Sequence, residues 1–405
     1  MSESMLVNAL RHAVSLVRGP IGDPIRPDWA DFDAVAISPF VNALTYAPEL
    51  QRIWGRWAVT PGSGSTLSAD AAARYLISRA RAQFSPDVII ADLLRFAASG
   101  EVDYQSVRAV TNVEVVESVP VGHNVRLMPP ASLPPGVCRN VAFQMGLAVG
   151  DDDRIAPGLS ALVVSVNMEP LRDAPRPQVV GGVPMPIPIL VAPEVQEQLD
   201  DAFVRARVAL VAAGGAAPKF GASYGYVSSP GWPLLIDNGV GGGAIVPPPP
   251  PRLTTAHASA LKRVYELAEA PDQTIMLAVD HLAAARMRQS DTERAIDIGS
   301  CLEILLMHEQ KSDNTEITNK ISHRGAWLIG NDGPSRLKAF KTIKEAYNFR
   351  SKAIHSGKLP VIKSMEEHEA RQSFFRESED IIGRLIEVLL QGWPKKWDEV
   401  TLSAN

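Results

Sequence analysis

After about residue 252, the chain carries apolar residues at every third or fourth position, which is the spacing of helices that bury one face. We refer to this region as the second part of the chain. Capping residues such as Asp272 and Thr292 precede several of these apolar runs. We predict helices from Thr254 or Thr255 to Leu267, from Asp272 to about Met287, from Glu293 to His308, from Glu316 to Ile329, within Gly333 to Lys363, and from Glu367 to Leu390. Because no convincing strand pattern lies among them, these segments indicate an all-α bundle.

The first part of the chain alternates between helical and strand-like patterns. Starts marked by serine or proline predict helices from Ala69 to about Phe84, from Pro86 to Gly100 and from Pro193 to Ala213, after one or two helices in the first 60 residues. Runs rich in β-branched or apolar residues predict strands within Val102 to Val125, at Leu162 to Met168 and at Ile187 to Val191. This mixture indicates an α+β domain.

A stretch rich in glycine and proline separates the two parts. Gly239 to Gly243 is rich in glycine, and Pro247 to Pro251 is a run of five prolines, a composition that favours an extended, semi-rigid spacer. A length of 405 residues also suits more than one domain. We therefore predict an N-terminal α+β domain over 1–238, which could act as a sensor, a linker over 239–251, and an α-helical domain over 252–405.

The composition is that of a globular protein, with 46% hydrophobic and 21% charged residues. No apolar run reaches the roughly 20 residues that span a bilayer, so we expect no membrane association. The amino-terminal segment is typical of an amphipathic helix and not of a secretory signal, because Arg11 and His12 interrupt its apolar stretch. The two cysteines, Cys138 and Cys301, lie far apart, which suits a reducing compartment. We therefore expect a cytoplasmic protein.

Common motifs for cofactors and metals are absent from the sequence. There is no phosphate-binding loop of the G-x-x-x-x-G-K-[ST] type, and neither an H-E-x-x-H motif nor a Cys/His cluster that would indicate a transition-metal site. Asp151 to Asp153 could hold a divalent ion, although a solvated turn is the simpler interpretation. We therefore expect neither a metal nor another cofactor.

One segment differs in charge from the rest of the chain. From Arg336 to Lys363 there are eight Lys or Arg residues and one acidic residue, whereas the whole chain has a formal charge of -5. Such a local basic surface favours a polyanionic partner. Apolar residues in the same segment keep helical spacing and predict a buried stripe made by Leu337, Phe340, Ile343, Tyr347 and Ile354.

Arg350 and His355 lie within this basic segment, five positions apart. A histidine near its ordinary pKa can accept or donate a proton, and an arginine fork matches a phosphate. Together they suit RNA cleavage without a metal, which needs a base for the ribose 2′-hydroxyl, charge stabilisation on the phosphate and an acid for the leaving oxygen. On an unbroken helix, five residues leave two side chains about 140° apart. Either the helix ends near His355, or a second copy completes the site.

The spacing alone does not identify a site, because Arg252 and His257 have the same separation at the exit of the linker. Arg252 adjoins the proline run, where we expect it to be solvated. Arg350 and His355 differ from that pair because several predicted core helices precede them and lysines surround them.

The second part resembles a HEPN domain of the Apea-like kind over about residues 255–390. Three segments carry the resemblance in order: AIDIGSCLEILL from Ala295, EITNKISHRGAWLIG from Glu316, and FKTIKEAYNFRSKAIHSGK from Phe340. The last contains the Arg-x4-His signature of the family as Arg350 to His355. The resemblance implies an α-helical bundle that dimerises and, in active members, a metal-independent endoribonuclease, often in bacterial antiphage defence or toxin systems.

The resemblance also implies roles for individual residues. Arg350 would bind the phosphate, His355 would be the acid/base residue, and Ser351 would occupy a polar position where Asn or Asp is common. Glu303 would support the site or be a surface charge of its helix, and Tyr347 would support the site or pack in the core. An RNA path would include Lys341, Lys344, Lys352 and Lys358, whose alternative role is a solvated helix face.

These patterns leave three hypotheses about function. In the first, the protein is an endoribonuclease effector with RNA as its substrate, a homodimeric helical part and an N-terminal part that binds a trigger or partner. In the second, the helical part is a noncatalytic module that only dimerises or binds RNA or protein, because fold alone does not establish catalysis. In the third, the N-terminal part is itself an enzyme, a hypothesis that no motif supports.

Overall fold

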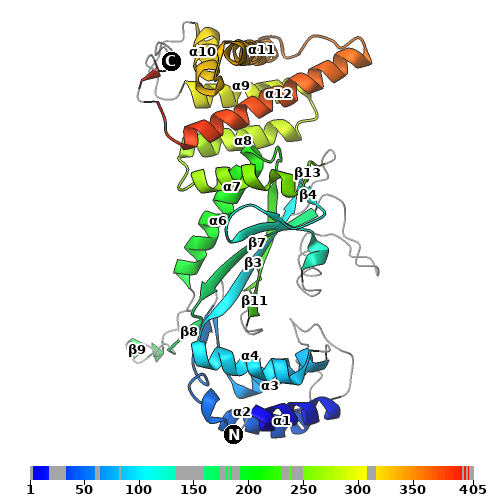
Figure 1. Ribbon diagram of the computed structural model, residues 1–405, viewed down its shortest axis with the longest axis vertical. Helices are drawn as coiled ribbons and strands as arrows, with labels where there is room; N and C mark the ends of the chain where they lie inside the picture. Colours follow the sequence, from blue (N-terminus) through cyan, green and yellow to red (C-terminus); the bar gives the residue numbers. More distant parts are fainter. Residues whose placement is uncertain are drawn as a thin grey trace.

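The computed structural model describes residues 3–17, 33–59, 64–81, 84–133, 159–173, 179–180, 183–184, 192–229, 237–238, 250–307, 316–394, 396–397 and 400. The molecule is elongated, with helices at the N-terminal end, a β-sheet in the middle and a helical bundle at the other end (Figure 1). This order confirms the expectation of a mixed N-terminal region followed by a helical region.

A small helical layer forms the N-terminal end of the molecule. It comprises α1 (Glu3–Leu16), α2 (Ala34–Tyr46), the short 3-10 helix η2 (Pro48–Leu50), α3 (Ala69–Arg81) and α4 (Pro86–Ser99). Leu10, Phe40 and Leu44 are buried between these helices. As predicted, α4 starts at Pro86 and ends at Gly100, whose φ of 72° lies in the left-handed region where glycine is favoured. A three-stranded sheet of β1 (Trp57–Val59), β2 (Gly64–Thr66) and β8 (Leu171–Arg172) adjoins them.

The central sheet has six strands in the order β12-β11-β3-β7-β6-β5. The strands are β3 (Val102–Thr111), β5 (Val119–Pro120), β6 (Val125–Met128), β7 (Leu159–Met168), β11 (Lys219–Ser229) and β12 (Asp237–Asn238). All neighbouring strands are antiparallel, and β3 pairs with β7 along its full length, from Val102 opposite Met168 to Thr111 opposite Leu159. The strand predicted from Leu162 to Met168 is therefore confirmed and begins earlier.

The remaining expectations for the first part have mixed outcomes. The strand-like pattern from Val102 to Val125 divides into several strands, among them the two-residue β4 (Glu114–Val115). β11 was not predicted, because glycine and serine interrupt its alternation of apolar and polar residues. The further short elements are β9 (Val179–Val180), β10 (Val183–Pro184) and the 3-10 helix η3 (Pro130–Ser132). The strand expected at Ile187 to Val191, Asp151 to Asp153 and Cys138 lie outside the described residues.

Helix α6 (Pro193–Ala212) joins the sheet to the bundle. It was predicted as a helix of the first part, and it packs against α7, α8 and α12 of the second part as well as against β7. Figure 1 shows it alongside the sheet with one end beneath the bundle. Residues 239–249 of the predicted linker lie outside the described residues. Most of the buried apolar residues form one cluster that extends from Leu6 to Leu389, so sheet and bundle share a core, and a second, smaller cluster includes Val107, Leu159 and Tyr224 of the sheet.

The bundle has six helices in the part of the chain that the structure describes after residue 250. They are α7 (Ala258–Leu267), α8 (Gln273–Met287), α9 (Asp291–Leu306), α10 (Ile317–Ile329), α11 (Gly333–Ser356) and α12 (Met365–Leu390). Asp272, Ser290 and Ser364 accept hydrogen bonds from backbone N–H groups of the first turns of α8, α9 and α12. One expectation was wrong, because the second part also contains the short strand β13 (Arg252–Leu253), which pairs with β4 in parallel.

The core face of α11 is made mainly of small residues. Ala339, Thr342, Ile343, Ala346, Tyr347 and Ala353 are buried. The predicted stripe was wrong at Leu337 and Ile354, whose exposed fractions are 54% and 48%. Leu337 leaves the helix about 120° from Ile343, on the solvent side, when each residue turns about 100°. Small residues replace it in the core because α11 lies very close to α9 and α10.

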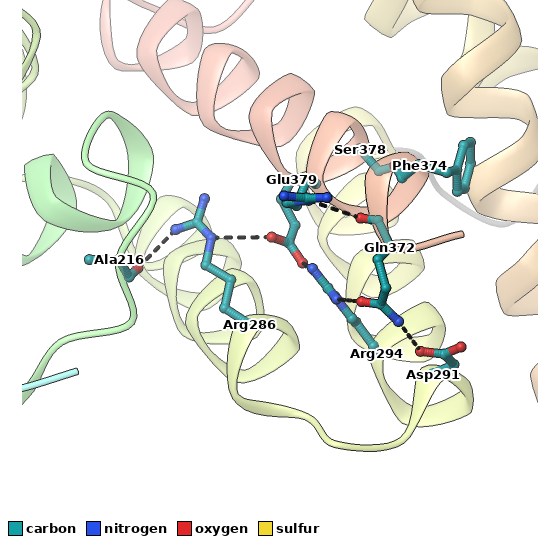
Figure 2. A network of polar contacts seen from close by, with 9 residues as sticks. Ala216, Arg286, Asp291, Arg294, Gln372, Phe374, Ser378 and Glu379 are labelled. Carbon is teal, nitrogen blue, oxygen red and sulfur yellow. Dashed lines mark hydrogen bonds and ion pairs between the residues drawn. The ribbon is translucent and has the colours of Figure 1, made fainter. Parts of the chain in front are cut away.

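A buried polar network ties α6, α8, α9 and α12 together (Figure 2). The carboxylate of Glu379, which is 4% exposed, accepts a hydrogen bond of 2.7 Å from Nε of Arg294 and pairs with Nε of Arg286 at 3.5 Å. Arg286 also donates to the carbonyl group of Val211, within the last turn of α6, at 2.7 Å, and to that of Ala216, just beyond the end of α6, at 2.8 Å. Because every charge in this network has a partner, it fixes how α6 docks onto the bundle.

Candidate functional site

Arg350 lies where α11 packs most closely against α9. A Cβ atom built on Gly299 of α9 would lie 2.3 Å from Cγ of Arg350, a distance that real Cβ atoms do not show. Only glycine therefore permits this approach of the two helices. Gly299 was not singled out by sequence reasoning. Its signal was its position four residues before Glu303, on the same face of the helix.

Glu303 and Tyr347 hold the guanidinium of Arg350. Nη2 of Arg350 donates to Oε2 of Glu303 at 2.7 Å, and Nη1 donates to the Tyr347 hydroxyl at 3.2 Å. The Tyr347 hydroxyl in turn donates a short hydrogen bond to Oε1 of Glu303. The structure therefore brings together three of the residues that the sequence singled out. Tyr347 itself is 5% exposed and packs in the core, which was one of its two expected positions.

The Tyr347 hydroxyl stays protonated near neutral pH. Its burial raises its pKa most, and the hydrogen bond and negative charge of Glu303 raise the pKa further, while Arg350 opposes them. A neutral hydroxyl can accept from Arg350 and donate to Glu303 at the same time. Tyr347 thus serves as a fixed bridge between the two charged groups and not as a proton acceptor.

The Arg350 cluster remains open to solvent on one side. The side chains of Arg350 and Glu303 are 24% and 29% exposed, and Glu303 lines a groove of about 610 Å³ between α8 and α9. Met276, Leu277 and Ile304 supply apolar surface in this groove. Nε of Arg350 is buried and has no hydrogen-bond partner among the described residues. The guanidinium therefore has donors that its neighbours do not use.

His355 lies on the other side of α11. The helix is unbroken from Gly333 to Ser356 and ends at Gly357, whose φ is 68°. Five helical residues turn the chain by about 140° beyond one full turn, so Arg350 and His355 leave α11 in different directions. The His355 side chain is exposed and makes no hydrogen bond or ion pair with any described residue. The helix thus ends where the sequence predicted, but its end does not bring the two residues together within one chain.

The lysines of α11 share the face of His355. Lys341, Lys344, Lys352 and His355 fall within about 80° of one another when each residue turns the helix by about 100°, and all four are exposed. We call these four residues the basic ridge. Lys358 is exposed just beyond the helix, and Ser351, which is half-buried, makes no side-chain hydrogen bond with a described residue.

The second arginine–histidine pair has a structural role. Arg252 forms an ion pair with Glu114 at 3.5 Å beside the β13–β4 contact. His257 accepts a hydrogen bond of 3.1 Å from the backbone N–H of Thr254 and so completes the capping of the short 3-10 helix η5 (Thr255–His257). The same spacing therefore serves a structural purpose there.

Comparison of the chain with protein-family models, curated proteins and solved structures found no match. The chemistry of the Arg350 cluster is therefore argued from its own geometry. Among the described residues, no group of three or more His, Cys, Asp or Glu side chains could hold a metal ion. No described helix combines the length and the apolar character needed to cross a bilayer.

Proposed function

We propose that the protein is a metal-independent endoribonuclease effector of the HEPN kind, acting as a homodimer in the cytoplasm, in antiphage defence or toxin-type growth arrest. The observation that carries this proposal is the division of α11 into two faces. Arg350 is held toward α9 by Glu303, while His355 stands with lysines on the exposed basic ridge. A cationic phosphate ligand and a solvent-accessible imidazole are the groups that this reaction needs.

Arg350 would bind the phosphate at the point of cleavage. An arginine has five N–H donors, of which Arg350 gives one to Glu303 and one to Tyr347. The remaining donors of its Nη groups can face a phosphate that enters from the open side of the cluster. Because Glu303 and Tyr347 fix the guanidinium beforehand, little side-chain entropy would be lost on binding.

His355 would transfer the protons. The 2′-hydroxyl of the ribose loses its proton and its oxygen bonds to the phosphorus. The bond from phosphorus to the 5′-oxygen then breaks, and that oxygen takes a proton, leaving a 2′,3′-cyclic phosphate and a free 5′-hydroxyl. One transfer needs a neutral imidazole and the other a protonated one. Two copies of His355, one from each subunit, could supply both.

A second subunit would also account for the directions in which Arg350 and His355 leave α11. Arg350 and His355 of one chain point in directions about 140° apart, so a single subunit cannot apply both to one phosphate from this helix. In a symmetric dimer, the two copies of α11 could meet around one phosphodiester. Ile354, which is 48% exposed and precedes His355, would then be covered by the partner. The basic ridges of both copies would extend the contact to the RNA strand on either side.

A noncatalytic dimerising module is the second candidate, and the ion pair of Arg350 favours it. Glu303 neutralises the guanidinium at 2.7 Å, as it would if Arg350 only held α9 and α11 together. In that case Arg350→Ala and His355→Ala would leave cellular activity intact, whereas Ile354→Glu would abolish it by separating the subunits. The ribonuclease proposal predicts that all three variants lose activity.

The decisive experiment is cleavage of single-stranded RNA by the purified full chain in the presence of EDTA. We expect products that end in a cyclic phosphate and complete loss of cleavage in His355→Ala. His368→Ala is the matched control, because His368 is another exposed histidine of the bundle, and it should cleave like the wild type. In cells, the N-terminal part would bind the trigger. Under triggering conditions we therefore expect growth arrest with the wild type and no arrest with His355→Ala. Equal growth of both strains under triggering conditions would contradict the proposal.

A further inference from the structure

A second cavity, of about 350 Å³, lies where the central sheet meets the bundle. Arg207 of α6, Lys219 at the start of β11, and Asp280, Met287 and Arg288 of the α8 region line it. The cavity is therefore formed by elements that precede and follow the predicted linker. Asp280 also lines the groove beside Glu303, so α8 separates the two spaces.

The charged lining of this cavity is predominantly positive. It contains three cationic residues, Arg207, Lys219 and Arg288, and one acidic residue, Asp280. Asp280 forms an ion pair with Arg207 at 2.5 Å, and Arg288 has its counter-charges outside the lining, in Asp297 at 2.7 Å and Glu293 at 3.8 Å. Lys219 has no such partner, because its exposed side chain makes no ion pair or hydrogen bond with a described residue.

Arg288 retains hydrogen-bond donors as well. Its Nε donates to Asp297 of α9 at 2.7 Å, and Glu293 lies 3.8 Å from Nη1, too far for a hydrogen bond. Its Nη groups therefore donate to none of the described residues. Asp297 holds the guanidinium in place through Nε, so the free donors are already oriented for an anion.

The uncharged lining is apolar and held in place. Pro218 and Met287 contribute apolar surface next to the cations. Asn112, which is 3% exposed, donates from Nδ2 to the carbonyl of Ala217 at 3.1 Å and lies 3.3 Å from the sulfur of Met287. These contacts hold Ala217 and Met287 in place, so binding of a ligand would not cost the entropy of ordering this wall of the cavity.

From this arrangement we infer that the cavity binds a phosphate-bearing small molecule. Arginine donors and an unpaired lysine are the groups that bind phosphate in proteins. A volume of about 350 Å³ is at the lower end of small-molecule sites and excludes a folded polymer. The adjoining apolar wall suits a flat ring, so a nucleotide fits both halves of the cavity. Inorganic phosphate or pyrophosphate is the alternative ligand with the same anionic groups.

Calorimetric titration of the full chain with ADP, pyrophosphate and adenosine tests this inference without reference to RNA cleavage. We expect ADP to bind and adenosine to bind at least tenfold more weakly, because a charge-assisted hydrogen bond contributes on this scale. Binding of pyrophosphate in preference to ADP would support the anion site and identify the ligand as a simple phosphate. Failure of both ADP and pyrophosphate to bind at millimolar concentration would overturn the inference.

Variants of surface lysines locate the binding. Lys219→Glu should weaken binding of ADP or pyrophosphate by tenfold or more, since it reverses the unpaired charge without breaking a contact of the fold. Lys262→Glu, a change of an exposed lysine on α7 that does not line the cavity, should leave the affinity unchanged. Equal affinity of Lys219→Glu and wild type would overturn the assignment to this cavity. The melting temperatures of both variants without ligand verify that they fold.

Discussion

Two arginine–glutamate clusters in the bundle have similar chemistry and different surroundings. In the first, Glu379 bridges Arg286 and Arg294, and the side chains of Glu379 and Arg286 are only 6% and 9% exposed. Burial lowers the pKa of Arg286, and the negative charge of Glu379 opposes that effect. In the second, the side chains of Arg350 and Glu303 are 24% and 29% exposed, and Glu303 lines a groove. The comparison teaches that the first cluster is closed by its partners, whereas the second retains unused donors and an approach for a ligand.

The largest expected effect is a difference in the free energy of unfolding between variants of the two clusters. Glu379→Ala should lower the free energy of unfolding by about 3–5 kcal/mol, because it leaves two buried arginines without their counter-charge. The matched change Glu303→Ala should lower it by about 1 kcal/mol or less, since solvent can replace the lost carboxylate. Denaturant titration of both variants measures the difference. Equal losses would show that the two clusters are alike and that the comparison fails.

The next effect concerns the close contact of α9 and α11. Gly299→Ala should destabilise the protein by about 1–3 kcal/mol, because the added Cβ would overlap the root of the Arg350 side chain. It should also displace Arg350 and reduce RNA cleavage. Gly333→Ala is the control, since a Cβ at Gly333 meets no atom within 4 Å. A Gly299→Ala protein with wild-type stability and cleavage would contradict the described packing.

A smaller effect tests the bridging hydroxyl. Tyr347→Phe removes one hydrogen bond to Arg350 and one to Glu303 and keeps the buried ring, so we expect a loss of about 1 kcal/mol. Because the hydroxyl holds Arg350 and transfers no proton, cleavage should fall severalfold while the pH profile keeps its shape. Rate measurements from pH 5 to 9 check this. A shifted pH optimum would instead identify Tyr347 as a proton-transfer group.

The smallest effect lies at the start of α11. The Ser335 hydroxyl and, to a smaller extent, the backbone N–H of Ser335, which donates to the Asp332 carboxylate at 2.7 Å, lower the pKa of Asp332. A lowered folded pKa means that the contribution to stability is present above the ordinary value of about 4 and disappears as the pH falls through the folded value. Asp332→Ala should therefore lower the melting temperature slightly at pH 7, and the difference from the wild type should shrink as the pH falls below about 4. A difference that stays constant as the pH falls would contradict this origin.

Local signals in the sequence predicted most of the elements. Asp272 precedes a helix and caps it, and Gly100 and Gly357 end helices as left-handed residues. These signals act within a few residues, so they can be interpreted without knowledge of the rest of the molecule. Arg350, Glu303 and Tyr347 were each named as candidates from the family-like segments that contain them, but the sequence did not predict that they contact one another.

Contacts between distant segments could not be predicted. Nothing near α6 in the sequence indicates that Arg286, more than 70 residues later, binds the carbonyl groups at its end. The exposure of Leu337 depends on how closely α9 and α10 approach α11, and Gly299 and Gly325 set that approach. The cavity lined by Arg207, Lys219 and Arg288 likewise has no local signature, since its residues come from three separate segments.

The central claim is that one site needs His355 from two subunits, and a purified heterodimer tests it most directly. Co-expression of wild-type and His355→Ala chains with different tags, followed by purification over both tags, isolates dimers that carry a single His355. If both imidazoles serve one phosphodiester, this heterodimer should retain less than about a tenth of wild-type cleavage, within the range of a lost general acid or base. Half of the wild-type rate would mean that each chain cleaves independently and would contradict the account.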